Sequence, residues 1–176
     1  MKKHILLLAL LSSFLTNSQE EEKVSLKQNE FKVNAAYLIA GFPEFTYEKR
    51  LNNEASLGIT LGFSINNNNG NEENNNAYSF SVIPYYRIYF GEKPSAGFFI
   101  DGNLALYSQK QRKGDFFSNA KEGGTGLGIG FNVGKKYTTK KGWVGELSMG
   151  ITRTLINADK IDLIYPRAGI IIGKVF

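Results

Sequence analysis

Side chains able to do acid–base, nucleophilic or metal chemistry are few, because the chain contains no Cys and a single His, His4. His4 lies in an N-terminal segment that we interpret below as a cleaved export signal, so the mature chain would contain neither imidazole nor thiol. Triads with His, Cys–His pairs, zinc sites with His or Cys ligands, haem held by His and disulfides are therefore excluded. Carboxylates, Lys, Ser and Tyr are the groups that remain.

These remaining groups form no recognisable catalytic or cofactor motif. Asp101 and Glu146 would need a cleft between them for acid–base work, and we interpret them as ion-paired structural groups. The glycine-rich run Gly123–Gly130 satisfies neither the G-x-G-x-x-G pattern nor a P-loop. The acidic residues at 72–73 and 159–162 do not match an EF-hand loop. We predict no enzyme activity, no cofactor and no metal.

The net charge does not indicate nucleic-acid binding. The chain carries a formal +5, of which Lys2 and Lys3 belong to the presumed signal. The other basic residues occur singly or in short clusters typical of turns, without a continuous basic stripe. We therefore predict no nucleic-acid partner.

The N-terminus has the three parts of a secretory signal. Lys2-Lys3-His4 form a positive head, Ile5–Leu11 form an apolar core, and small polar residues follow, with cleavage expected after Ser18. The apolar run is shorter than the ~20 residues that a spanning helix needs, and no lipid-accepting Cys follows it. The sequence thus predicts a signal peptide over residues 1–18, a solvated periplasmic linker over 19–30 and one domain over 31–176.

From residue 31 onward the chain alternates with the period of two that is typical of β-strands. In Ser56–Ile65, the clearest case, every second residue is large and apolar and the others are Gly, Ser or Thr. The pattern predicts eight strands, at 31–40, 45–51, 56–65, 78–90, 97–108, 125–135, 143–155 and 164–176. Longer and shorter connections alternate, which indicates an antiparallel up-and-down β-barrel. The Asn-rich run 66–76 should be an exposed loop, and we expect a β-bulge at Pro84, which lacks a ladder donor.

The residues on the strand face opposite the apolar one indicate whether the apolar face points out of the barrel or into it. This opposite face carries mostly Gly, Ser, Ala and Asn, whereas the outside of a soluble barrel would carry Lys, Glu, Thr and Gln. Small residues suit the narrow inside of an eight-stranded barrel, and large apolar residues suit contact with lipid. We therefore expect the apolar face to point outward. The charges within strands share the small-residue face and would form a lumen polar network: Lys32, Glu48, Arg87, Asp101, Glu146 and Arg167. Four aromatic residues should form a girdle at one rim: Phe90, Phe98, Trp143 and Phe176.

The amino terminus and three stretches carry a resemblance to a known family: Lys32–Tyr37, Pro84–Phe90 and the last strand Ala168–Phe176, which ends on an aromatic. Over residues 31–176 the chain resembles the small eight-stranded outer-membrane barrels of Gram-negative bacteria, of the OmpA and OmpX type, and the uncharacterised barrel families around them. The resemblance implies a plugged, salt-bridged interior without an open pore. It also implies that the barrel assembly machinery reads the apolar residues of the last strand, here Ile170, Ile172 and Phe176, although Lys174 departs from that pattern.

The sequence therefore predicts a non-enzymatic transmembrane β-barrel of the cell outer membrane, surrounded by lipid. Its extracellular loops would have structural roles or would bind a surface ligand that the sequence does not identify. Phe116 and Phe117 are the candidate loop contact, unless they pack back onto the barrel rim. The alternative is a soluble secreted or periplasmic barrel that binds an apolar ligand, with Leu57, Ile59, Leu61 and Phe63 inside. An enzyme on the barrel, dependent on carboxylates, Lys, Ser and Tyr, is a third hypothesis.

Overall fold

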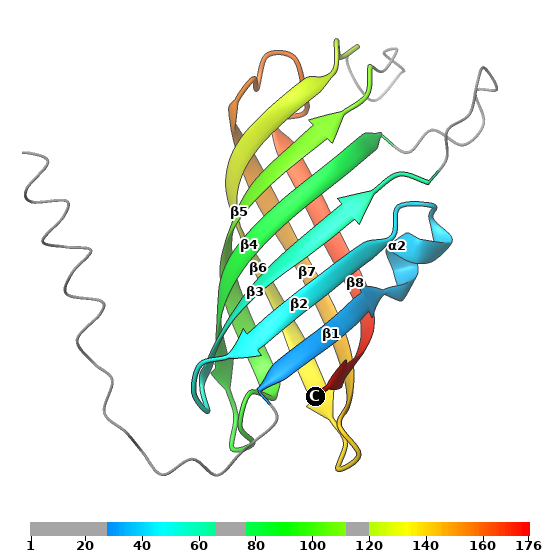
Figure 1. The fold of residues 1–176 in the computed structure, drawn as a ribbon. Helices are drawn as coiled ribbons and strands as arrows, with labels where there is room; N and C mark the ends of the chain where they lie inside the picture. Colours follow the sequence, from blue (N-terminus) through cyan, green and yellow to red (C-terminus); the bar gives the residue numbers. More distant parts are fainter. Residues whose placement is uncertain (1–27, 66–76, 112–119) are drawn as a thin grey trace, which may run out of the picture.

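The computed structural model describes residues 28–65, 77–111 and 120–176, and these form a closed antiparallel barrel in which each strand pairs with its sequence neighbours and β1 pairs with β8. The prediction of an eight-stranded up-and-down barrel is confirmed. Figure 1 shows the tilted strands, which are β1 (Asn29–Asn34), β2 (Glu44–Arg50), β3 (Ala55–Phe63), β4 (Tyr78–Phe90), β5 (Gly97–Gln109), β6 (Gly124–Thr138), β7 (Trp143–Ile156) and β8 (Ile164–Val175). The expected signal peptide, the polar run 66–76 and the pair Phe116–Phe117 lie outside the described residues.

The two ends of the barrel differ in their connections. Residues 51–54, 91–96 and 139–142 join strands at the end where the chain reaches Phe176, which we call the turn end. The strand ends that border the longer connections, 35–43, 64–77, 110–123 and 157–163, lie at the opposite end, which we call the loop end. The alternation of long and short connections follows from the meander, in which every second connection returns to the same end.

Large apolar side chains of the strands point outward. Leu57, Ile59, Leu61 and Phe63 are between 37% and 52% exposed, while the intervening residues of β3 are buried. The expectation of the soluble-barrel alternative that these four side chains lie inside is therefore wrong. Small residues face inward because little volume is available there: a Cβ added at Gly58 would overlap the Tyr85 ring. Within the described residues, no helix is both long and apolar enough to cross a membrane.

The first strand is shorter than the alternation predicts. It ends at Asn34 instead of residue 40, because the Asn34 side chain accepts a hydrogen bond from the Tyr37 backbone N–H and so caps the short helix α2 (Ala35–Ile39). Gly41 follows with a φ of 78°, a conformation that glycine adopts without steric cost. The strand also begins at Asn29, two residues before the expected domain boundary, so the expected linker over 19–30 overlaps β1.

Because β1 is short, one edge of β8 lacks a strand neighbour over part of its length. The pairs between β1 and β8 end at Ile171, whereas β8 continues to pair with β7 as far as Ile164. Side chains at the start of α2 take the place of the missing strand: Asn34 Nδ2 donates to the Ala168 carbonyl at 3.1 Å, and Tyr37 Oη accepts from the Ala168 N–H at 3.3 Å. Pro166 lies on the same stretch of β8, and proline is tolerated at such an edge because it has no N–H to leave unpaired.

Replacing Tyr37 by Phe should loosen this edge. The Tyr37 hydroxyl accepts from the Ala168 N–H and donates to the Pro166 carbonyl at 3.5 Å, and the variant removes both bonds while keeping the ring. We expect a loss of about 1 kcal/mol in unfolding free energy and faster hydrogen exchange at the Ala168 amide than at the β7-paired amides of β8. Unchanged exchange at Ala168 would show that the hydroxyl does not hold this edge.

The bulge expected at Pro84 is absent from its predicted place. The register of β4 with β3 runs without a shift through Pro84, which lies opposite Ile59. Pairs with β5 pause after Val82 and resume at Tyr85 in the same register, so the strand tolerates the missing donor without an extra residue. The irregularity lies between Tyr78 and Phe80, and it turns Tyr78 inward onto the Tyr107 and Tyr165 rings.

Candidate functional site

The polar interior of the barrel is the candidate site, and it contains all six charged residues that the alternation assigned to the lumen. Lys32, Glu48, Arg87, Asp101 and Glu146 are each at most 3% exposed. The Arg167 side chain, at 14%, is the most accessible of the six. These residues come from β1, β2, β4, β5, β7 and β8, so the closed meander brings together groups that are far apart in the sequence.

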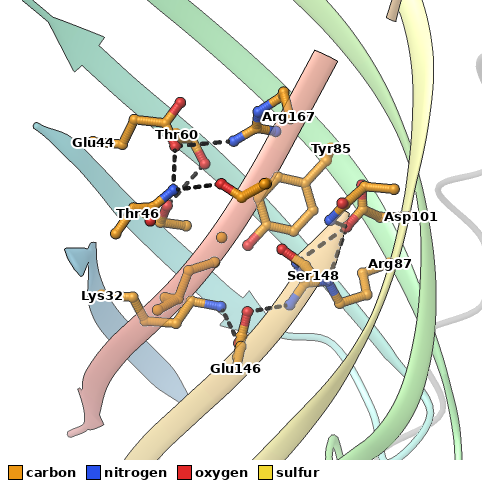
Figure 2. Close-up of a pocket in the computed structure, with 15 residues that line it drawn as sticks. Lys32, Glu44, Thr46, Thr60, Tyr85, Arg87, Asp101, Glu146, Ser148 and Arg167 are labelled. Atoms are coloured by element: carbon orange, nitrogen blue, oxygen red, sulfur yellow. Dashed lines mark hydrogen bonds and ion pairs between the residues drawn. The ribbon is translucent and has the colours of Figure 1, made fainter. Parts of the chain in front are cut away.

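Lys32 and Arg87 flank one carboxylate in the middle of the lumen. Lys32 Nζ lies 2.7 Å from Glu146 Oε1, and Arg87 Nη1 lies 3.0 Å from Glu146 Oε2, as Figure 2 shows. Arg87 also contacts Asp101 Oδ2 at 3.0 Å, and its guanidinium carbon is 3.7 Å from the centroid of the Phe99 ring. Each charge is thus compensated by a neighbour, which burial in a medium of low dielectric constant requires.

Glu48 is a carboxylate that contacts both cations and tyrosine hydroxyls. Its two oxygens lie 2.6 Å from Lys32 Nζ, 3.0 Å from Lys136 Nζ and 3.2 Å from Arg87 Nη1. It also accepts short hydrogen bonds from two buried tyrosine hydroxyls, those of Tyr85 and Tyr89. Glu48, on β2, therefore holds together groups from three other strands, β1, β4 and β6.

Several lumen residues were missed by the sequence reasoning. Lys136 lies just beyond the predicted strand 125–135, but β6 extends to Thr138 and places Lys136 inside, 2.6 Å from Glu30 Oε2. Glu30 had been assigned to the solvated linker, yet it lies in β1 and is 1% exposed. Continued alternation was the available signal, because Glu30 precedes Lys32 by two positions and Lys136 follows Asn132 by four.

A second, smaller polar group lies nearer the loop end. Arg167 Nη2 approaches Glu44 Oε2 at 3.4 Å, and Asn34 Nδ2 donates to the same oxygen at 3.0 Å. These residues line a cavity of about 20 Å³, with Thr46 and Thr60 on its wall (Figure 2). That volume is enough for about one water molecule, so the cavity does not accommodate an organic ligand.

The loop end of the lumen is closed by packed side chains. The Tyr107 and Tyr165 rings stack with centroids 4.5 Å apart, and Ile83 and Ile161 are fully buried beside them. Tyr107 Oη also bonds to the Thr154 hydroxyl. Stacked, buried aromatics of this kind fill the cross-section above the ion pairs.

This arrangement is suited to structural ion pairing. Among the described residues, the ion pairs of the interior join five cations to five carboxylates: Lys32, Arg50, Arg87, Lys136 and Arg167 with Glu30, Glu44, Glu48, Asp101 and Glu146. Three of these carboxylates have oxygens within 4.8 Å of one another, a spacing that suits a metal ion. Lysine and arginine nitrogens already contact all three, so the positive charge that a metal would supply is present in the protein.

The residues expected to guide assembly and to form the rim lie on the outer surface. Ile170, Ile172 and Phe176 point outward near the end of the chain, each more than half exposed. At the turn end, Phe90 lies opposite Phe98, with ring centroids 6.2 Å apart, and Trp143 lies opposite Lys174. The four expected girdle aromatics are thus all exposed at one end of the barrel.

The fold and the filled interior define a closed eight-stranded β-barrel protein whose lumen is packed with paired charges. The chain is similar to the crystal structure of the N-terminal β-barrel domain of Pseudomonas aeruginosa OprF, with a TM-score of 0.57 and 14% identity, over 85% of this chain and 96% of that one. No curated protein matches the chain. The chain belongs to the family described as protein of unknown function (DUF3575), whose model matches residues 4–168.

Proposed function

We propose that the chain is a non-enzymatic outer-membrane barrel that spans the membrane with its eight strands. The observation that carries the proposal is the outer surface, where large apolar side chains are exposed on the strands around the barrel, as at Leu57, Leu104, Phe131 and Ile151. A soluble monomer rarely exposes a continuous apolar surface of this extent, whereas lipid tails cover such a surface without cost.

Two further features support the proposal. The polar groups lie inside, and the small cavity among them has no space for a substrate, which favours a structural role over catalysis. The fold is shared with the OprF barrel domain, and closed up-and-down barrels are a common form of outer-membrane proteins.

In this proposal the exported chain is inserted by the barrel assembly machinery, which reads Ile170, Ile172 and Phe176 on the last strand. The loop end faces the outside of the cell and supplies whatever surface contacts the protein makes. The turn end, with the shorter connections, faces the periplasm.

Fractionation of cells that express the full chain tests this proposal. The protein should be found in the outer-membrane fraction, should require detergent for extraction, and should migrate differently on a gel before and after boiling, because a closed barrel resists detergent until it is heated. Release into a periplasmic wash, with the same mobility in both samples, would contradict the membrane location.

A further inference from the structure

The turn end carries exposed basic side chains that the interior does not use. Among the described residues, six lysines at this end are exposed, and two exposed glutamates, Glu54 and Glu92, accompany them. The six are Lys49, Lys93, Lys135, Lys140, Lys141 and Lys174. No ion pair between described residues includes any of these six, whereas Lys32 and Lys136 inside the lumen each contact several carboxylates.

The loop end does not share this excess. The exposed charged residues described there are Arg153 and Lys160 on the basic side and Glu122 and Asp159 on the acidic side, which balance. The asymmetry between the two ends therefore concerns charge, in addition to loop length. It indicates that the turn end meets a negatively charged neighbour.

Two of the lysines are placed by aromatic rings of the rim. Lys174 Nζ lies 5.0 Å from the centroid of the Trp143 ring, and Lys135 Nζ lies 5.3 Å from that of Tyr137. Exposed Trp and Tyr rings prefer the boundary between hydrocarbon and headgroups. An ammonium group held against such a ring lies at the height of the lipid phosphates, with its methylene stem along the apolar wall.

We propose that the turn end binds anionic phospholipid headgroups, with the phosphates contacted by Lys135 and Lys174 at the rim and by Lys140 and Lys141 in the adjoining turn. This inference rests on the proposed membrane location and adds the chemistry of the lipid and the end of the barrel that selects it. The lysines are spread over β2, β6, β8 and two turns, so they surround the rim and can contact several lipids.

Lipid retention by the full-length protein tests this inference. The refolded chain is equilibrated in micelles that contain equal amounts of phosphatidylglycerol and phosphatidylcholine, and the lipids that stay bound are counted by native mass spectrometry. We expect a several-fold preference for phosphatidylglycerol, which falls in high salt because exposed charges are screened. The variant with Lys135→Gln, Lys140→Gln, Lys141→Gln and Lys174→Gln should lose most of that preference.

A control removes four positive charges from the loop end, two on exposed side chains (Arg153→Gln and Lys160→Gln) and two on half-buried ones (Lys110→Gln and Lys121→Gln). It should keep the preference, and the heat-dependent gel shift should show that both variants fold. Equal retention of the two lipids by the parent protein, or an equal loss in the two variants, would overturn the inference. So would binding of soluble polyglutamate in place of phosphatidylglycerol, since that would identify an acidic polypeptide as the partner.

The outcomes for the two proposals are distinct. Failure of the parent chain to insert into vesicles of either lipid would overturn the proposed membrane location and this inference with it. Insertion into both, without a lipid preference, would overturn this inference alone.

Discussion

Replacing Glu48 by Gln should lower the unfolding free energy of the barrel by about 3–5 kcal/mol, the range found when one partner of a buried ion pair is removed. Glu48 is 1% exposed and contacts three cations, Lys32, Arg87 and Lys136. The amide keeps the volume of the side chain but leaves these cations with one negative charge too few. Urea unfolding of the barrel in lipid vesicles, followed by the heat-dependent gel shift, measures the change.

Two further variants make the result specific. Glu92→Gln removes a carboxylate that is exposed in a turn, and its unfolding free energy should stay close to that of the parent protein. Adding Lys136→Met to Glu48→Gln removes one of the three cations that lose Glu48 as a partner and should recover part of the loss. A Glu48→Gln barrel as stable as the parent would refute the view that ion pairing holds the lumen together.

An arginine placed in the middle of the outer face should cost about 2–4 kcal/mol, because the side chain would have to be accommodated in hydrocarbon. Leu147 is suited to this test, since it lies between the rim residue Trp143 and the loop end of β7 and its side chain is 58% exposed. Leu147→Arg should therefore destabilise the barrel in vesicles, as measured by the urea midpoint.

The matched control is Ile156→Arg, on the same strand and similarly exposed at 53%, but at the loop end. Near the interface the same substitution should cost about 0–1 kcal/mol. Equal small effects at the two positions would mean that no hydrocarbon layer surrounds the barrel, and would contradict the proposed function.

The sequence was sufficient to predict the barrel and the facing of its side chains, because alternation assigns each strand residue to one side. Arg87 and Asp101 could be placed together inside from this pattern alone. The prediction from alternation failed where local hydrogen bonding ends a strand early. Asn34 is an example, because its side chain caps α2 at a position where the pattern predicts a longer strand. The prediction also failed at strand ends: Glu30 and Lys136 were placed in polar flanking segments, although both lie in the lumen.

The seam between β1 and β8 has a consequence for self-association. Between Ile164 and Ile171 the β1-facing edge of β8 has no strand partner. Its main-chain groups at Pro166 and Ala168 could pair with a strand from another molecule. The hydroxyl of Tyr37 and the side-chain amide of Asn34 already form hydrogen bonds with these main-chain groups. Pro166 has no N–H to donate to an added strand. The residues of the short helix and its cap therefore shield this part of the β8 edge in the closed barrel against edge-to-edge pairing with another molecule.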